Sequence, residues 1–464
     1  MEKENHKISV REILKVTKGE LVTGNEECLC QNFERDSREV KEGDIYLGIQ
    51  GETINGSIYF EEAFANGAKG AILQDIQITK EQKEKYKNKF IIIVENTIKA
   101  MQQIATYKRS MYNIPVVAIT GSVGKTSTKD MVANVMNEKF NTLKTQGNYN
   151  NHIGVPLTIF RLKNEDALTI EMGMNHSGEI STLTKIAKPT VCVITKIGTA
   201  HIGNLGSREN ILKAKLEILE GMKKGGTVVI NNDNDLLHKW YLENKEKYKI
   251  ITYGIENESD FSAENIESKE DGSTYTLKGT NVKINVPVGG NHFVLNSLCA
   301  IAVGSIFEIP MEKIKHGIES FELTKKRMDI TKTAENITII NDCYNANYDS
   351  MKAALEYLGK IENKRKIAVL GDMLELGEYS KELHEKVGQE IIKNKIDILI
   401  VVGKEAKHIA NIAKTEMNKE NIIECESNEE AANEINKIKK TNDCILFKAS
   451  NGMKFGEIIE KIHN

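Results

Sequence analysis

Residues 121–127 have the types and spacing of a loop that binds the phosphates of a nucleotide. The segment consists of Gly121, Ser122, Val123, Gly124, Lys125, Thr126 and Ser127. Backbone N–H groups in such a turn, at the N-terminus of a helix, bind phosphate oxygens without help from side chains. The Lys125 ammonium would neutralise the β- and γ-phosphates, and the Thr126 hydroxyl would bind Mg²⁺.

The loop departs from the full Walker pattern at one position, because Ile119 stands where its first glycine is usual. Both flanks agree with the pattern, since residues 116–120 predict a β-branched strand and residues 127–138 predict a helix. The alternative is an ordinary strand–turn–helix with an exposed lysine. A phosphate loop indicates nucleotide binding but not the reaction, because GTPase-type switches and kinases also carry one.

Short apolar runs alternate with amphipathic charged stretches, a pattern typical of α/β units on parallel sheets. We predict strands at residues 90–94, 116–120, 191–195, 227–230, 337–340, 367–370 and 398–402. A helix-like stretch at 97–111 closes the first block, and a charged segment at 322–329 precedes the last. We therefore expect three α/β domains, at residues 1–108, 109–323 and 324–464.

Charge and composition exclude several classes of protein. The 464 residues include 63 basic and 66 acidic side chains, so no global positive field attracts nucleic acid. No uncharged apolar stretch approaches the ~18 residues of a membrane span, and the charged N-terminal segment is unlike a signal peptide. Seven scattered cysteines without a CxxC pair favour reduced thiols in a cytoplasmic protein over a disulfide scaffold or a zinc site.

Five segments of the middle block resemble, in order, the central motifs of the Mur ligase family. They are residues 121–126, 147–158, 171–174, 200–207 and 214–218. One such match would be weak, whereas five in the family's order are specific. The resemblance implies an ATP-dependent ligase that activates a carboxylate as an acyl phosphate and joins it to an amine.

The resemblance also implies roles for individual residues of the middle block. Glu171, at the end of a strand-like run, and His201, in a Gly-rich loop, would bind a second Mg²⁺. Lys215 would carry a carbamate that supplies further metal ligands, and its alternative is a solvated helix lysine. Lys125, Lys215 and His201 are then the catalytic residues. The ATP-binding set would be the loop 121–127 together with Asn296, Arg327 and Asp342.

The last block resembles the branch of the family that adds D-alanyl-D-alanine. Residues 341–347 are similar to the branch's DDxYNAN segment, and residues 371–377 match its GDMxELG segment. Asn345 and Asn347 are therefore candidates to orient the dipeptide.

The first block holds a turn similar to the family's UDP-binding DSR turn, so Ser37 and Arg38 would contact the UDP-linked substrate. The resemblance implies an N-terminal UDP-substrate domain, a central P-loop ATPase domain with a mostly parallel sheet, and a C-terminal Rossmann-like domain. The expected ligands are UDP-N-acetylmuramoyl-tripeptide, D-alanyl-D-alanine, ATP and two Mg²⁺ ions, and a monomer is expected. Another Mur-type ligase, a folylpolyglutamate synthase-like enzyme and a silent nucleotide-binding protein stay open as alternatives.

Some positions differ from the residues usual in this branch. Asn341 replaces the first aspartate of DDxYNAN, Tyr348 a proline, Phe293 an asparagine and Ser57 a histidine. Residues 448–451 read Lys-Ala-Ser-Asn where the branch has KGSR. The phosphate and metal segments are unchanged.

Overall fold

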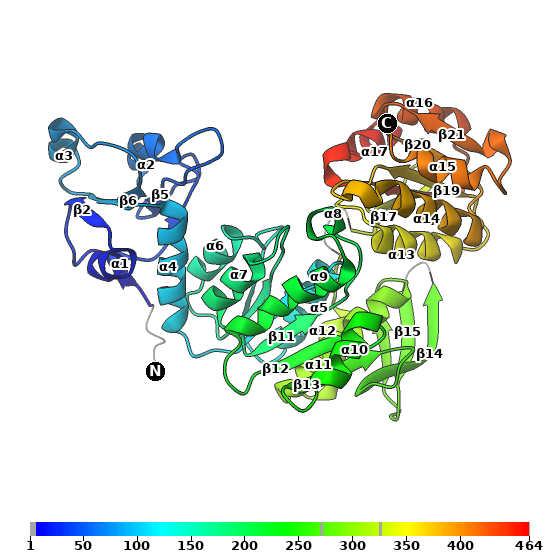
Figure 1. Ribbon diagram of the computed structural model, residues 1–464, viewed down its shortest axis with the longest axis horizontal. Helices are drawn as coiled ribbons and strands as arrows, with labels where there is room; N and C mark the ends of the chain where they lie inside the picture. The colour runs from blue at the N-terminus through cyan, green and yellow to red at the C-terminus, as the bar shows by residue number, and fades with distance from the viewer. Residues whose placement is uncertain (1–5, 270–271, 324–326, 464) are drawn as a thin grey trace.

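The computed structural model describes residues 6–269, 272–323 and 327–463, which form three successive lobes (Figure 1). The N-terminal lobe contains a five-stranded sheet in the order β2-β7-β6-β5-β4, with β2 antiparallel to β7 and the other pairs parallel. These strands are β2 (Glu20–Thr23), β4 (Phe33–Glu34), β5 (Ile45–Leu47), β6 (Gly70–Leu73) and β7 (Phe90–Ile93). A two-stranded ribbon and the first helices complete the lobe: β1 (Ile8–Ser9), β3 (Leu29–Cys30), α1 (Val10–Thr17), α2 (Phe60–Ala65) and α3 (Lys80–Lys85).

The central lobe is built on a nine-stranded sheet in the order β16-β15-β14-β13-β12-β11-β8-β10-β9. Pairing is parallel from β9 to β14, whereas β15 and β16 continue the sheet antiparallel. Strands β8, β10, β11 and β12, in the middle of the sheet, are buried along their whole length, as expected of parallel strands covered by helices. The parallel strands are β8 (Val116–Thr120), β9 (Thr142–Lys144), β10 (Ala167–Glu171), β11 (Val191–Ile194), β12 (Thr227–Asn231) and β13 (Lys249–Gly254), followed by β14 (Phe261–Lys269), β15 (Gly272–Leu277) and β16 (Lys283–Val286).

Two helices of the central lobe are largely buried in its core. Helix α5 follows the phosphate loop and packs against α11, whose mainly apolar residues are buried on nearly every side. The helices of this lobe are α5 (Lys125–Asn137), α6 (Gly154–Phe160), α7 (Glu179–Ala187), α8 (Ile202–Leu205), α9 (Arg208–Leu216), α10 (Asp235–Asn244), α11 (Asn291–Ile306) and α12 (Met311–Glu319).

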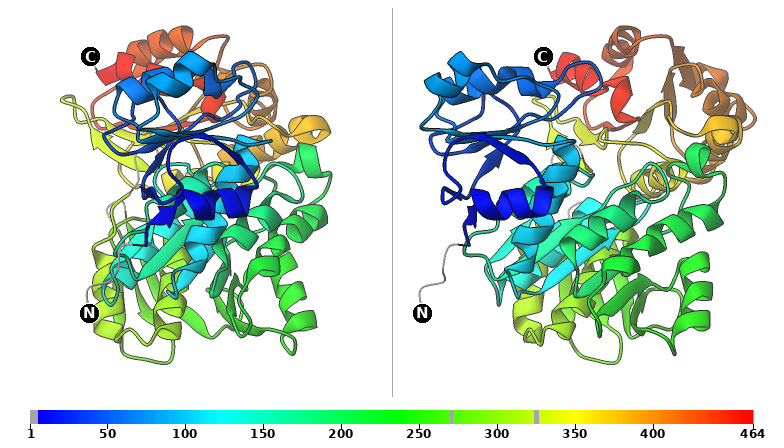
Figure 2. Two further views of the ribbon diagram at one scale, coloured as in Figure 1. Left: turned by 90° about the vertical axis from the view of Figure 1, so that its left-hand side faces the viewer. Right: turned by 60° about the vertical axis from the view of Figure 1, so that its left-hand side comes forward.

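The C-terminal lobe has a six-stranded sheet in the order β17-β18-β22-β19-β20-β21, parallel except for β17. Its strands are β17 (Asp329–Lys332), β18 (Thr338–Asn341), β19 (Lys366–Gly371), β20 (Ile398–Val402), β21 (Ile422–Cys425) and β22 (Cys444–Lys448). Helices cover the sheet: α13 (Tyr348–Gly359), α14 (Ser380–Lys393), α15 (Lys407–Ala413), α16 (Asn428–Ile438) and α17 (Gly456–His463). Figure 2 shows this lobe and the N-terminal lobe on the same side of the central lobe.

Helix α4 (Thr97–Ser110) joins the N-terminal lobe to the central lobe through two buried cations. Lys108 Nζ donates to Phe160 O at 2.6 Å, and Arg109 Nε donates to Ala187 O at 2.8 Å. These carbonyls end α6 and α7, where the helix dipole places partial negative charge. The joint therefore pairs buried cations with helix C-termini.

All seven predicted strands are present within one or two residues of the predicted bounds. The boundary predicted near 108 falls inside α4, and the one at 324 lies outside the described residues, so both stay predictions. None of the described helices has the length and apolar character needed to cross a membrane.

Candidate active site

Three neighbouring strands deliver the candidate residues to one edge of the central sheet. Strand β8 lies between β10 and β11, and the register aligns Glu171 with Ile119 and Ile194 with Thr120. The phosphate loop, the Glu171 carboxylate and the loop after β11 therefore leave the sheet at the same level. Ligands of α/β proteins bind at this carboxyl edge.

The backbone conformation of the phosphate loop, residues 121–126, leaves N–H groups available to bind an anion. Gly124 has φ = 86°, a left-handed value that favours glycine, and the first turn of α5 has no side-chain cap. The first N–H groups of α5 are thus left for an anion. Lys125 Nζ donates to Gly121 O at 2.9 Å. Burial lowers the pKa of Lys125, Glu171 opposes this shift, and Arg327 adds to it.

Both oxygens of the buried Glu171 carboxylate accept a hydrogen bond. Thr126 Oγ1 donates to Oε2 and Asn150 Nδ2 donates to Oε1, each at 2.8 Å. The hydroxyl and the carboxylate are hard oxygen donors, which suit Mg²⁺. No cluster of three or more His, Cys, Asp or Glu side chains suited to a metal occurs in the described part of the chain.

Lys215 is not a solvated helix lysine. Its side chain, on α9, is 1% exposed, and the structure records no hydrogen bond or ion pair for its amine among the described residues. Burial, and secondarily the charge of Lys125, lowers the pKa of Lys215 well below the usual lysine value. Lys215 therefore loses its proton more readily than an exposed lysine.

A cleft of about 410 Å³ gathers most of the predicted residues. Its walls include the phosphate loop from Ser122 onward and the predicted residues Ser127, Glu171, His201, Asn296, Arg327, Asp342, Asn345 and Asn347. Lys215 is not among the described residues that line it. Ser37 and Arg38 lie in the N-terminal lobe, where Ser37 Oγ donates to Glu62 at 2.6 Å and Arg38 Nη2 donates to Asp36 at 2.6 Å.

Neighbouring groups fix the residues predicted to contact ATP. Asn296 Oδ1 accepts a hydrogen bond from Thr128 Oγ1 at 2.9 Å, which ties α11 to α5. The Arg327 guanidinium lies 3.9 Å from the centroid of the Tyr344 ring, a cation–π contact. Asp342 accepts from Lys448 Nζ, so the charges of these two residues balance.

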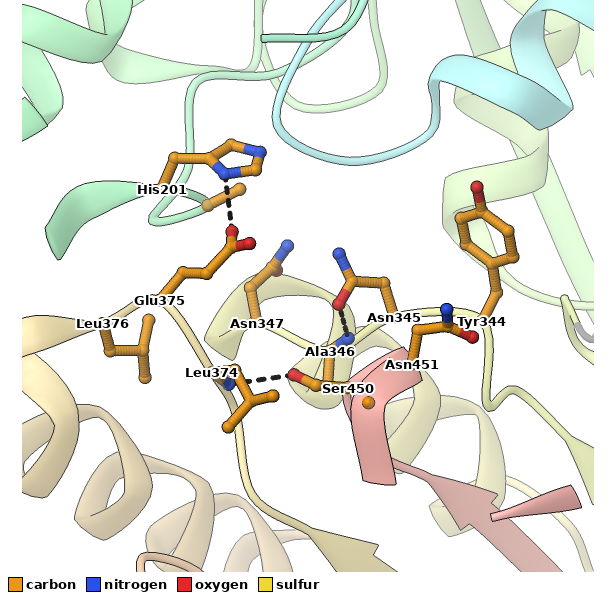
Figure 3. A pocket seen from close by; sticks show the side chains of 12 residues that line it. His201, Tyr344, Asn345, Ala346, Asn347, Leu374, Glu375, Leu376, Ser450 and Asn451 are labelled. Carbon is orange, nitrogen blue, oxygen red and sulfur yellow. Dashed lines mark hydrogen bonds and ion pairs between the residues drawn. The ribbon is translucent and has the colours of Figure 1, made fainter. Parts of the chain in front are cut away.

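A second cavity of about 250 Å³, the polar pocket, opens beside the cleft (Figure 3). Its lining consists of Ala200, His201, Tyr344, Asn345, Ala346, Asn347, Leu374, Glu375, Leu376, Ser450, Asn451 and Gly452. Five of these residues, His201, Tyr344, Asn345, Asn347 and Glu375, also line the cleft. The two cavities therefore share a wall.

The shared wall contains a contact between two lobes. His201 Nδ1 lies 2.8 Å from Glu375 Oε2, and Figure 3 shows the two side chains facing each other. Both residues have positive φ, 63° and 64°, a strained conformation that is common at functional sites. His201 lowers the pKa of Glu375, against the effect of burial. The position of Glu375 in the motif 371–377 was a signal that sequence reasoning did not use.

The amide groups of Asn345 and Asn347 have fixed orientations. Asn345 Oδ1 accepts from Ala346 N at 2.9 Å, and Asn347 Oδ1 accepts from Ser350 N at 3.0 Å. Each Nδ2 group is consequently left as a donor, and Figure 3 shows both pointing away from the backbone of their segment. The amides can therefore bind an oxygen-bearing ligand.

Fold and site together define an α/β nucleotide-binding protein whose phosphate loop adjoins a separate polar pocket. Residues 119–304 match the Mur ligase middle domain, and residues 326–451 match the Mur ligase, glutamate ligase domain. The chain belongs to the Mur ligase family.

Its relatives include proteins named UDP-N-acetylmuramoyl-tripeptide–D-alanyl-D-alanine ligase. The chain is 35% identical to the one from Bacillus subtilis (strain 168), with 98% of each chain covered. Identity to the one from Escherichia coli (strain K12) is 33%, over 81% of this chain and 82% of the relative.

Solved structures of related proteins have the same fold as this chain. A crystal structure of MurF from Acinetobacter baumannii has a TM-score of 0.88 at 28% identity and covers 99% of both chains. MurF ligase from Thermotoga maritima, in complex with ADP, has a TM-score of 0.81 at 28% identity and covers 93% of this chain and 97% of that one.

Proposed function

We propose that this chain is the ATP-dependent ligase that adds D-alanyl-D-alanine to UDP-N-acetylmuramoyl-tripeptide and so makes the pentapeptide precursor of peptidoglycan. The observation that carries the proposal is the wall shared by the phosphate-loop cleft and the polar pocket. A ligase needs an activated carboxylate and an amine to meet at one point, and two adjoining cavities provide this. The names of the full-length relatives supply the substrates.

In the proposed reaction, the terminal carboxylate of the tripeptide attacks the γ-phosphorus of ATP, which releases ADP and forms an acyl phosphate. The amine of D-alanyl-D-alanine then attacks the acyl carbon and loses a proton. The tetrahedral intermediate expels phosphate and leaves the amide. The chemistry brings several anionic oxygens together, so positive charge around them lowers the barrier.

The chain supplies part of that charge from two lobes. Lys125, on the central lobe, and Arg327, at the start of the C-terminal lobe, both line the cleft. Thr126 and Glu171 would hold Mg²⁺, which when bound adds positive charge beside the phosphate oxygens. The contact between His201 and Glu375 joins the two lobes beside the reacting groups, which would help to exclude water from the acyl phosphate.

The polar pocket would receive the dipeptide. The free Nδ2 groups of Asn345 and Asn347 suit its carbonyl or carboxylate oxygens, and the Glu375 carboxylate suits its ammonium. All three side chains are on the wall shared with the cleft, so a dipeptide bound to them would lie next to the phosphate-loop cleft.

Lys215 would act as a carbamate. In its neutral form the buried amine would react with CO₂ and lose a proton, and the resulting carbamate would replace a cation with oxygen donors close enough to Lys125 to feel its charge. His201, Glu171 and this carbamate together would hold a second Mg²⁺.

Three further assignments complete the proposal: the residues that bind UDP, the oligomeric state and the cellular compartment. Ser37 and Arg38 would bind the UDP moiety from the N-terminal lobe, and the enzyme would act as a monomer. ATP and the nucleotide-linked substrate point to the cytoplasm as its compartment.

The test is release of inorganic phosphate from ATP in the presence of each substrate alone and of both. A ligase of this kind releases phosphate only when the muramoyl tripeptide and D-alanyl-D-alanine are both present, and the product gains the dipeptide's mass. Turnover with a single amino acid in place of the dipeptide would indicate another Mur-type ligase. Nucleotide binding without turnover would indicate a silent binding protein. Parallel assays with lysine- and diaminopimelate-ended tripeptides identify the natural third residue.

A further inference from the structure

The loop after β11, residues 195–199, is fastened to the phosphate loop by three hydrogen bonds. Ser122 N donates to Lys196 O at 2.8 Å, and Gly198 N donates to Ser122 Oγ at 3.0 Å. Thr195 Oγ1 donates to Val123 O at 2.6 Å. Movement of the phosphate loop therefore displaces this neighbouring loop.

The same loop is bound on its other side by one carboxylate of the C-terminal lobe. Asp349 Oδ2 accepts from Thr199 N at 2.9 Å and from Thr199 Oγ1 at 3.2 Å. Lys196 Nζ lies 3.1 Å from Asp349 Oδ1. A Cβ atom on Gly198 would lie 2.1 Å from Asp349 Oδ2, so a larger residue there would displace this carboxylate. Both carboxylate oxygens are thus engaged across the lobe boundary.

Asp349 is nearly buried, with 13% of its side chain exposed, and it stays ionised. Burial alone would raise the pKa of Asp349, but the charge of Lys196 and the hydrogen bonds from Thr199 outweigh burial and lower it. The carboxylate also lies in the first turn of α13, where the helix dipole favours negative charge.

Asp349 is two residues from Asn347, the N-cap of α13, which lines the polar pocket. Asn345 lies in the segment just before α13, Asn347 caps that helix, and Asp349 lies in its first turn. A carboxylate that fixes α13 to the β11 loop therefore also fixes the amides that face the pocket.

We propose that Asp349 is a positioning residue that holds the polar pocket in register with the phosphate loop, so that a nucleotide bound at the loop steadies the pocket. The inference rests on the proposed function, in which this pocket receives the amine. Coupling between two sites is reciprocal and commonly changes affinity about fivefold or more.

The test uses ADP alone, so its outcome does not depend on ligation. Hydrogen exchange of the amides in residues 347–352 is measured with and without saturating ADP and Mg²⁺. In the unaltered protein ADP should slow this exchange about fivefold, because local opening of the segment becomes rarer. In Asp349→Ala the slowing should disappear, while the dissociation constant for ADP stays within about twofold.

Two further variants separate coupling from a loss of folding. Lys196→Met removes the ion pair but leaves the hydrogen bonds from Thr199, so part of the slowing should remain. Glu356→Gln, on the exposed side of α13, is the matched control and should behave like the unaltered protein. In the ligation assay, Asp349→Ala should raise KM for D-alanyl-D-alanine at least tenfold and change KM for ATP far less.

Equal slowing by ADP in Asp349→Ala and the unaltered protein would overturn the inference, as would an absence of slowing in the unaltered protein. The same loss of slowing in Glu356→Gln would overturn it too, since the effect would then lack specificity for Asp349. Failure of the ligation assay with the exchange result intact would instead reject the proposed function.

Discussion

In the proposed reaction Lys125 acts most directly on the phosphates, and its Nζ donates to Gly121 O of the same loop. Lys125→Ala should lower kcat/KM by about 10³ or more, because it removes a charge that acts on the transferring phosphoryl group. Steady-state kinetics check this, with Lys139→Ala, an exposed lysine just beyond α5, as the control. Near-normal turnover of Lys125→Ala would remove the loop from the mechanism.

Substitution of Lys215 tests whether this residue carries a carbamate. If it carries a carbamate, Lys215→Ala should lose activity and recover part of it with acetate or another short carboxylate, which supplies the missing oxygens. Lys213→Ala, an exposed residue on the same helix, should stay active without any addition. Full activity of Lys215→Ala in the absence of carboxylate would contradict the assignment.

Residue types and spacing predicted a phosphate loop, because such a loop is local in sequence, and the structure places its residues in the cleft. Thr126 and Glu171 meet at hydrogen-bonding distance although 45 positions separate them, since α5 begins just after β8 and Glu171 ends β10, the adjacent parallel strand. Asn150 and Asp349 were missed. Their partners come from other segments or another lobe, and nothing local to either residue indicates those contacts.

At the scale of elements, Asn347 combines two functions that can be separated. Its Oδ1 caps α13, and its Nδ2 faces the polar pocket. Asn347→Asp keeps the cap and suits the helix dipole but replaces the donor with a negative oxygen, so KM for D-alanyl-D-alanine should rise while the melting temperature holds. Asn347→Ala should raise KM as well and cost about 1 kcal/mol of stability.

Asn345→Ala is the matched comparison, because Asn345 lines the same pocket without capping a helix. It should raise KM for the dipeptide and leave the melting temperature nearly unchanged. Unaltered KM in both Asn345→Ala and Asn347→Asp would mean that the dipeptide binds elsewhere.

Element prediction worked for some of the buried parallel strands. The predicted strands at 116–120 and 398–402 coincide with β8 and β20, because covered parallel strands read as continuous apolar runs. Strands β14–β16, which pair antiparallel with one another, were not predicted. β14 alternates buried and exposed residues only in part, and a register shift interrupts its pairing with β15, so its sequence lacks a clear two-residue period.

At the scale of the whole molecule, the joint between the first two lobes should respond to pH. Burial, and secondarily Lys163, lowers the pKa of Lys108 to about 8 from the usual 10.5. Below about pH 8 the amine is protonated in both folded and unfolded chains, and the cost of burying its charge is fully present. Between that pH and 10.5 the unfolded chain binds more protons, so this residue's contribution to stability rises with pH.

Lys108→Met removes that titration. The melting temperature of the unaltered protein relative to Lys108→Met should therefore increase from pH 8 to pH 10.5. Lys99→Met, exposed on the same helix, is the control and should show a constant difference across this range. A constant difference for Lys108→Met as well would show that the buried amine does not titrate in this range.

The order of strands in the C-terminal lobe has a consequence for the growing polypeptide. β22 is made after every other strand of its sheet, yet it lies in the middle, between β18 and β19. Until it leaves the ribosome, the nascent lobe consists of two half-sheets with open edges, which invite pairing with other chains. Ser450, Asn451 and Gly452 follow directly and complete the polar pocket. A chain that ends before β22 would thus aggregate before its polar pocket could bind an amine substrate. A premature stop codon near the end of the message would then be as damaging as one near its middle.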